Sequence, residues 1–239
     1  MIKPDKIFYT PTLDSKAKIF ILPEEESKHA IKVLRMQTGE CIHLINGIGG
    51  LFEAEIVNPH PKHCELKINT AQLEYNKRNF SIHIAIAPTK MNERLEWFLE
   101  KATEIGIDEI TPIICRYSER KEVKLARMEK VLVAAMKQSV KAYKPILNEA
   151  STFDQLLTRY STAQKFIAHC YQDSKQQLKD VCQKGKDVLI LIGPEGDFSQ
   201  EEIEKAFQAG FVPVSLGASR LRTETAGVVA CHTVNLLHE

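Results

Sequence analysis

The chain has 239 residues, of which 44% are hydrophobic and 26% charged, with a formal net charge of +1, as is typical of a globular protein of one large or two modest domains. No apolar run approaches the about 18 residues that a membrane span needs, and the N-terminus lacks the apolar core of a signal peptide. The six cysteines are scattered without a C-x-x-C pair, which predicts free thiols in a reducing cytoplasm and argues against a metal cluster.

Residues 1–72 have the pattern of a β-rich domain. Short strands are expected at 6–9, 18–22 and 64–68, and a hairpin at 41–57, where Asn46-Gly47 supplies the positive φ of the turn. Residues 24–35 have the partial apolar spacing of one short helix. Several short strands with frequent turns predict a small barrel, followed by a polar linker around 73–79.

From residue 80 to the end, predicted strands alternate with predicted helices. Strands are expected at 82–87, 110–115, 166–168 and 188–192, and helices between them. The run 188–192 is apolar at every position, which suits a central parallel strand buried on both faces. Ser199 and Glu202 form a capping box for a helix that runs to Ala209. The alternation predicts a parallel α/β sheet in a domain spanning 80–239.

Positive charge is concentrated between residues 116 and 144, where nine Lys or Arg residues stand against three Glu residues. Such a strip on a nearly neutral chain is compatible with contacts to phosphate groups. It is also typical of a solvated helix face, which charge alone favours.

The stretch 188–230 carries the strongest candidate for a ligand site. One apolar run ends at Gly193-Pro194-Glu195-Gly196, a second ends at Gly217, and a polar loop follows at 222–225. Open α/β sheets bind ligands at the carboxyl ends of their strands, and glycines let the backbone approach a ligand closely. For any one of these glycines alone, a simple turn is the favoured explanation. Walker, G-x-S-x-G and H-E-x-x-H motifs are absent from the sequence.

Four motifs in order give the chain a family resemblance. The first three are HAIKVLRMQTGE (29–40), KMNERLEWFLEKATEIGIDEITPI (90–113) and KQSVKAYKP (137–145). The fourth is LIGPEGDFSQEE followed by SLGASRLRTETAG, within 191–227. Together they resemble the RsmE family of the SPOUT class, which methylates N3 of a uridine in 16S ribosomal RNA.

The resemblance implies a barrel similar to PUA domains, then a SPOUT domain with a deep trefoil knot that forms homodimers. It also implies that S-adenosylmethionine is bound by three loops. By match, the residues of these loops are Gly193, Pro194, Glu195, Gly196, Ser215, Leu216, Gly217, Leu221, Arg222, Thr223, Glu224 and Thr225. Candidate contacts to ribosomal RNA are Lys6, Arg35, Lys90, Arg116, Arg120, Lys121, Lys124 and Lys141.

The chain departs from the commoner family pattern at several positions. Ala218-Ser219 stands where many members have Pro-Arg, and an arginine follows at Arg220. Asp197 stands where many have glycine, and Lys6 and Lys141 stand where many have arginine. Lysine offers a point charge without the guanidinium fork, so these two positions lose bidentate contacts.

The expected chemistry is removal of a weakly acidic proton from uridine N3 and stabilisation of charge at O2 or O4. Arg222 is the candidate for the electrostatic role. Glu224 either accepts the proton or orients Arg222 through an ion pair, and both interpretations remain open. The target base must be unpaired or extruded. Arg35 contacts RNA or braces the barrel.

Two other functions stay open at this point. One is a SPOUT ribose 2′-O-methyltransferase, which would share the cofactor pocket. The other is an RNA-binding or ribosome-assembly factor with a vestigial pocket. The intact GPEG and RTET sequences argue against the second, and the LGxxxLRTETA string argues against the first.

Overall fold

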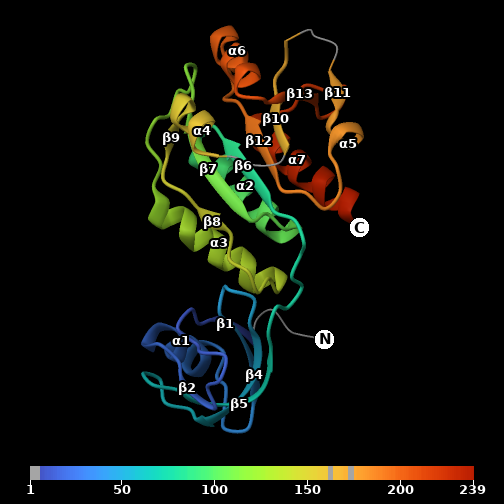
Figure 1. The fold of residues 1–239 in the computed structure, drawn as a ribbon. Coiled ribbons are helices and arrows are strands. Elements are labelled where there is room, and N and C mark those ends of the chain that lie inside the picture. The colour runs from blue at the N-terminus through green and yellow to red at the C-terminus, as the bar shows by residue number, and fades with distance from the viewer. Residues whose placement is uncertain (1–5, 161–163, 172–174) are drawn as a thin grey trace. The chain divides into compact units, whose positions relative to one another are not determined.

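The computed structural model describes residues 6–160, 164–171 and 175–239 (Figure 1). The chain forms two compact units, each built from two segments. The first unit comprises Met1–Lys77 and Val133–Lys144, and the second comprises Arg78–Leu132 and Pro145–Glu239. The first five residues of the domain expected at 1–72 lie outside the described residues. No sequence signal marks the return of 133–144 to the first unit, because helix α3 (Leu125–Ser139) runs through the boundary without interruption.

The first unit is built on a five-stranded sheet, as its β-rich pattern predicts. The strands are β1 (Ile7–Tyr9), β2 (Ile19–Ile21), β3 (Cys41–Ile45), β4 (Leu51–Asn58) and β5 (Glu65–Gln72), in the order β1-β3-β4-β5-β2. Only β1 and β3 pair in parallel. Alternate strand residues turn inward, so that Phe8, Phe52 and Leu66 meet in one apolar core.

The single helix expected at 24–35 has two parts in the structure. α1 (Glu24–Lys28) continues without a break into a π-helical turn, His29–Val33. The amide of Leu34 donates to the carbonyl of His29 at 3.0 Å, five residues back. Arg35 then takes a left-handed backbone (φ 55°) that ends the turn. Apolar spacing over so few residues does not distinguish the two kinds of helical turn.

The segment 133–144 packs onto the first unit through apolar and charged contacts. Met136 and Ala142 share a buried cluster with Ile7 and Ile45. Lys137 forms an ion pair with Glu26 at 3.1 Å. Residues that are distant in sequence therefore complete the core of this unit.

The second unit contains a fully parallel sheet, which confirms the predicted α/β class. Its strands are β6 (Ile82–Ile86), β7 (Glu109–Ile114), β8 (Ile146–Leu147), β9 (Ser151–Thr152), β10 (Gln164–Ala168), β11 (Gln176–Gln177), β12 (Val188–Ile192) and β13 (Val212–Ser215). The order is β11-β13-β10-β12-β6-β7-β8, and β9 pairs with β7. β8, β9 and β11 have two residues each, too few for a sequence pattern. Strand order does not trace a knot, so the trefoil knot stays a prediction.

Helices cover both faces of this sheet (Figure 1). α2 (Asn92–Ile105), α3, α5 (Leu178–Val181) and α7 (Thr223–His238) share one core. α4 (Phe153–Arg159) and α6 (Gln200–Gln208) share the other. Val188, Ile190 and Ile192 face the first core, and Leu189 and Leu191 face the second. β12 is therefore buried on both faces, as its sequence predicts.

The starts of α6 and α7 show what the local sequence can and cannot predict. The predicted capping box of α6 is confirmed, because Ser199 and Glu202 bond each other's backbone amides. The polar loop predicted at 222–225 is wrong in part, since Thr223–Thr225 form the first turn of α7 and Arg222 is its N-cap residue. Thr and Glu in a first turn suit a helix as well as a loop, because the N-terminus of a helix favours negative charge.

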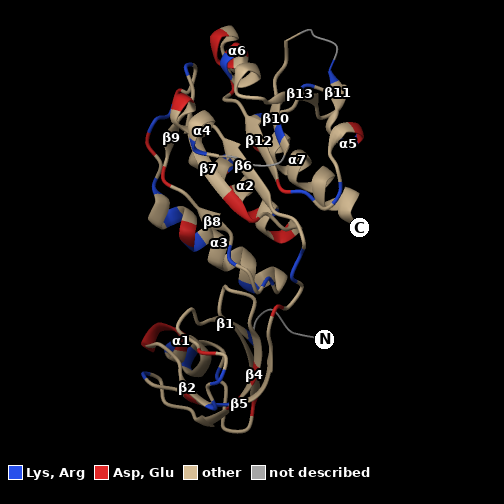
Figure 2. Cartoon of the chain, in the orientation of Figure 1, with Lys and Arg blue, Asp and Glu red and all other residues tan. Residues whose placement is uncertain are grey.

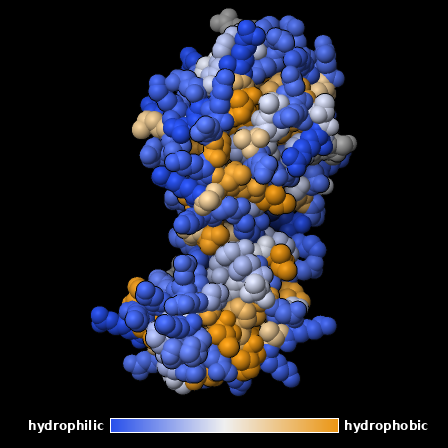
Figure 3. All heavy atoms as spheres, turned by 90° about the vertical axis from the view of Figure 1, so that its left-hand side faces the viewer, coloured by the Kyte–Doolittle hydropathy of each residue, from blue (hydrophilic) through white to orange (hydrophobic). Residues whose placement is uncertain are grey.

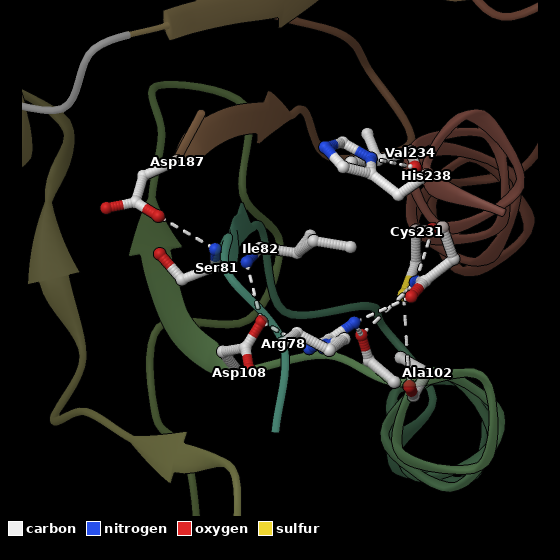
Figure 4. A network of polar contacts seen from close by, with 11 residues as sticks. Arg78, Ser81, Ile82, Ala102, Asp108, Asp187, Cys231, Val234 and His238 are labelled. Atoms are coloured by element: carbon white, nitrogen blue, oxygen red, sulfur yellow. Dashed lines mark hydrogen bonds and ion pairs between the residues drawn. The ribbon is translucent and has the colours of Figure 1, made fainter. Parts of the chain in front are cut away.

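A network of polar contacts joins the first and last residues of the second unit (Figure 4). The Arg78 guanidinium donates to the Gly106 carbonyl at 2.7 Å and to Asn235 Oδ1 at 2.6 Å, and pairs with Asp108. His238 stacks on Phe80 with ring centroids 3.6 Å apart. The end of α7 is thereby fastened to the chain that enters β6.

The surface is mainly hydrophilic, with separate apolar patches on the face drawn in Figure 3. Exposed apolar side chains include Ile19, Ile21 and Val33 in the first unit, and Trp97 and Tyr117 in the second. Among the helices that the structure describes, none is both long enough and apolar enough to cross a membrane.

The close approach of α7 to the sheet generates a test at Gly227. A methyl group at this position would lie 2.6 Å from the Phe98 ring and 3.0 Å from Ile86. Both neighbours are fully buried and cannot yield freely. We expect Gly227→Ala to lower the free energy of unfolding by about 1–3 kcal/mol, despite the better helix propensity of alanine.

Chemical denaturation followed by circular dichroism measures this effect. Gln208→Ala is the control, because Gln208 is an exposed position of α6 and should change stability by less than about 0.5 kcal/mol. A Gly227→Ala protein as stable as the parent would contradict the close packing of α7.

Candidate functional site

Three segments meet where the central strands of the second unit end. Gly193–Gly196 follows β12, Ser215–Gly217 ends β13, and Leu221–Thr225 leads into α7. They line two adjoining cavities of about 690 and 270 Å³. A side chain added at Gly217 would meet nothing, so the backbone there borders open space. The backbone-lined walls and the volumes fit a nucleoside-sized ligand.

Most of the residues predicted to bind the cofactor border these two cavities. The larger cavity is lined by Gly196, Ser215, Leu216, Gly217 and Leu221. The smaller is lined by Gly193, Pro194, Glu195, Leu221, Arg222 and Thr223. Thr225 lines neither, and borders a third pocket instead.

The loop after β10 contributes a wall that no sequence motif marks. Ala168 and Cys170 border both cavities, and His169, Tyr171 and Lys175 border the larger one. β10 lies between β12 and β13 in the sheet, so the residues after it reach the same edge. These wall residues could be predicted from the sequence only if the central position of β10 in the sheet were already known.

The Pro194–Asp197 turn depends on the unusual backbone of Asp197. Its amide donates to the Pro194 carbonyl at 2.9 Å, and its φ is 65°. This conformation explains why glycine is common at the position, and Asp is among the residues that tolerate it best. The carboxylate accepts from the amides of Cys170 at 2.7 Å and Phe198 at 2.8 Å. The side chain therefore ties together two loops that glycine would leave separate.

The start of α7 is fastened to the loop after β12. The Thr223 hydroxyl donates to the Gly193 carbonyl at 2.9 Å, and both groups are buried. Gly193 lies against the Phe198 ring, where an added methyl would come within 3.1 Å. Residue 193 is thus packed closely between Thr223 and the Phe198 ring, and the position requires a small residue.

Hydrogen bonds also hold the neighbouring loops around Glu195. The Lys90 amide donates to Glu195 Oε1 at 3.0 Å, and the Arg120 guanidinium donates to the Lys90 carbonyl at 2.7 Å. Tyr117 lies over Gly196, with its Cβ 3.1 Å from where a side chain would begin. Glu195 Oε2 is buried and has no hydrogen-bond partner among the described residues.

A third pocket, of about 570 Å³, adjoins the other two. It is lined by Glu93, Arg94, Trp97, Arg220, Leu221, Arg222, Glu224 and Thr225. Arg220 and Leu221 border all three cavities, so the chain just before α7 is their common wall. Ala218 and Ser219, where the sequence departs from the family pattern, border only the largest.

The two candidate catalytic residues occupy different surroundings. Arg222 is exposed, and its side chain makes no hydrogen bond or ion pair with the residues that the structure describes. Glu224 is buried, and its Oε1 lies 3.9 Å from Nε of Arg94. The guanidinium nearest to Glu224 is thus that of Arg94, which the sequence did not single out.

Five of the candidate RNA contacts belong to the second unit. Lys90 pairs with Glu119 at 2.9 Å, and this hydrogen bond raises the pKa of the Lys90 ammonium. Arg116 lies 3.7 Å from Glu201, and Arg120 bonds the Lys90 carbonyl. Lys121 and Lys124 are exposed. Figure 2 shows basic residues along this loop and along α3.

The other three candidates, Lys6, Arg35 and Lys141, belong to the first unit. Lys6 pairs with Glu40 at 3.0 Å. The pKa of Glu40 is lowered, first by the Gln37 amide and then by Lys6. Arg35 is exposed at the end of the π-helical turn, and Lys141 is partly buried.

Two family models match the chain. Residues 76–235 match an RNA methyltransferase domain, and residues 22–69 match an RNA methyltransferase PUA domain. Ribosomal RNA small subunit methyltransferase E of Rickettsia conorii is 26% identical over 238 residues, covering 99% of this chain and 97% of the relative.

Solved structures resemble the whole chain. A protein of Porphyromonas gingivalis described as a probable rRNA-methyltransferase is 42% identical, with a TM-score of 0.90 and 98% of each chain covered. Ribosomal RNA small subunit methyltransferase E of Neisseria gonorrhoeae, solved with S-adenosyl methionine bound, is 27% identical, with a TM-score of 0.87 and 98% of each chain covered.

Substitutions of Asp197 separate its backbone role from its side-chain role. Asp197→Gly removes the carboxylate contacts but keeps the left-handed backbone, and we expect a loss of about 1–3 kcal/mol in the free energy of unfolding. Asp197→Ala should lose about 1–2 kcal/mol more, because the backbone is then strained. Asp197→Asn retains acceptor and backbone and should lose least.

Denaturation and amide hydrogen exchange measure the two roles. Exchange at the Cys170 amide should be faster in the glycine and alanine variants than in the asparagine variant. If all three variants had the same free energy of unfolding as the parent protein, Asp197 would not hold the loops together.

Proposed function

Because this chain belongs to the RNA methyltransferase family, we propose that it methylates N3 of a uridine in 16S ribosomal RNA with S-adenosylmethionine. The observation that carries the proposal is the position of Arg222. This residue borders both the smaller cofactor cavity and the third pocket, and its guanidinium has no partner among the described residues. An unengaged cation at a wall between two cavities is available to a reactant in either one.

The two adjoining cavities would hold the cofactor. Gly193–Gly196 and Ser215–Gly217 supply backbone walls, and Leu221–Thr223 close the third side. S-adenosylmethionine supplies a methyl group on a positively charged sulfur. The residues that line the two cavities would bind it and exclude water, and Arg222 would lie between it and the third pocket.

Arg222 and Glu224 would act on the uridine. Loss of the N3 proton places negative charge on O2 and O4, which the Arg222 guanidinium stabilises by hydrogen bonds. Glu224 Oε2 is buried and has no hydrogen-bond partner among the described residues, so it can accept the proton from N3. The bound cofactor would supply the methyl group to N3 and leave as a neutral thioether, while Arg222 holds the charged edge of the base and Glu224 keeps the proton.

The remaining parts of the chain would deliver the RNA. Lys6, Arg35 and Lys141 on the first unit, and the basic loop 116–124 on the second, supply candidate phosphate contacts. We further propose that the chain acts as a knotted homodimer in the cytoplasm, on 16S ribosomal RNA within the small subunit, as the family resemblance implies.

Mapping of ribosomal RNA nucleosides by mass spectrometry, with and without this protein, tests the proposal directly. We expect one uridine of 16S RNA to carry an N3 methyl group only when the protein is present. A ribose 2′-O-methyl nucleoside would identify a different SPOUT methyltransferase. Cofactor binding without any RNA modification would identify an assembly factor.

Arg222→Ala tests the electrostatic role. We expect at least an about 100-fold loss of N3-uridine methylation, because the charge that develops on the base then lacks its stabilising donor. Arg222→Lys should recover only part of the rate, since lysine lacks the guanidinium fork. The measurement is the initial rate on small subunits from cells that lack the protein.

Arg159→Ala is the matched control, because Arg159 is an exposed arginine of the second unit that borders none of the three cavities. It should retain the parental rate. Near-normal activity of Arg222→Ala in a folded dimer would end the assignment.

A further inference from the structure

The third pocket contains two side chains that the proposed chemistry does not use. Arg94 and Trp97 project from the first turns of α2, opposite Glu224 and Thr225 in the first turn of α7. The family resemblance singled out neither residue. The pocket therefore needs an account of what these two residues bind.

Glu224, which lines the pocket, has a carboxylate oxygen that receives no hydrogen bond from the described residues. Its side chain is 8% exposed, and Oε2 is buried with no partner among the described residues. Arg94 lies beside the other oxygen, with Nε 3.9 Å from Oε1. A buried carboxylate oxygen without a donor is costly, and such groups are rare in folded proteins. A ligand that presents an N–H to Oε2 would remove the cost.

Trp97 shows that the pocket has an aromatic wall. Its side chain remains 42% exposed although tryptophan is the largest apolar residue. Aromatic rings that border a basic pocket are the surfaces on which unstacked bases of RNA rest. The same pocket is bordered by Arg94, Arg220 and Arg222.

The kinds of polar groups in the pocket match one base. The pairing edge of uracil presents an acceptor, a donor and an acceptor, which are O2, N3–H and O4. The pocket is lined by complementary groups, the Glu224 carboxylate as acceptor and the guanidinium groups of Arg94 and Arg222 as donors. Cytosine would bring an acceptor at N3 against the carboxylate, and two acceptors facing each other repel. A volume of about 570 Å³ has room for a base and its ribose.

We propose that this pocket receives the extruded uracil base, with Trp97 as the surface on which the base stacks and Arg94 as the residue that positions the Glu224 carboxylate. The inference rests on the proposed function, because it names the place where the substrate base of that reaction binds. It adds two residues from α2 to a site otherwise built from the loops after β10, β12 and β13 and from the first turn of α7.

Trp97 is the only tryptophan of the chain, so its fluorescence reports the pocket alone. The probe is a short single-stranded RNA with one central uridine, titrated into the full-length protein with S-adenosylhomocysteine present. We expect quenching of the emission and protection from iodide. The same RNA with cytidine at the centre should quench less, because N3 of cytosine repels Glu224.

Kinetics of two Trp97 variants test the stacking role. Trp97→Ala should lower kcat/KM for small subunits by about 5- to 150-fold, the range for one stacked base. Trp97→Phe keeps an aromatic face and should stay close to the parent. Phe207→Ala is the control, because Phe207 is also 42% exposed in the second unit but lies outside the pocket. Cofactor affinity by calorimetry should be equal in all of them.

Arg94 is tested by conservative rescue. Arg94→Ala should lower kcat more than it raises KM, since the carboxylate loses its position and the RNA contacts remain. Arg94→Lys should restore much of kcat by supplying a charge near Oε1. Equal losses in both variants, with lower thermal stability, would assign Arg94 to the fold and overturn its positioning role.

The remaining outcomes separate this inference from the proposed function. Methylation of uridine by a Trp97→Ala protein at the parental rate, or emission indifferent to the uridine probe, would overturn the pocket assignment and leave the function standing. A Trp97→Ala protein that becomes monomeric in sedimentation would assign Trp97 to contacts between copies and also overturn it. Quenching by RNA in a parent that methylates no uridine would instead contradict the reaction.

Discussion

The docking of the first turn of α7 against the end of β12 is the contact on which the site depends. The Thr223 hydroxyl bonds the Gly193 carbonyl, and Gly227 one turn later admits the Phe98 ring. The residues just before this turn, Arg220 and Leu221, form the wall common to all three cavities. A helix held a few ångströms farther from the sheet would open the cavities into one another. The places proposed for the cofactor and the base would then no longer be separate.

The sequence could predict what local patterns determine. β12 is apolar at every position because both of its faces are covered, and the α6 capping box needs only Ser199 and Glu202. The glycines of the site could also be predicted from the sequence, since they follow apolar runs. The residues that tertiary contacts bring in could not be predicted. Trp97 belongs to a helix with an ordinary apolar face, and only the position of α7 makes it the wall of a pocket.

Other differences have equally physical origins. The return of 133–144 to the first unit depends on contacts of Met136 with distant strands, which no spacing reveals. Asp197 departs from the commoner glycine, yet its carboxylate accepts two backbone amides. Compared with glycine, Asp197 has less backbone freedom, but its side chain connects the loops after β10 and β12. Glycine is therefore not essential at this position, because Asp197 adopts the same backbone conformation and holds the turn through its side chain.

The network at Arg78 has a consequence for how the protein is made. Arg78 meets Asn235, 157 positions later, and His238 stacks on Phe80 at the same end of α7. A ribosome synthesises the chain from its N-terminal side, so α7 can dock only after every strand of the sheet has been made. The strands and the other helices can form earlier, but the wall made by Arg220 and Leu221 cannot. A nascent chain therefore has no finished site until α7 has emerged and docked.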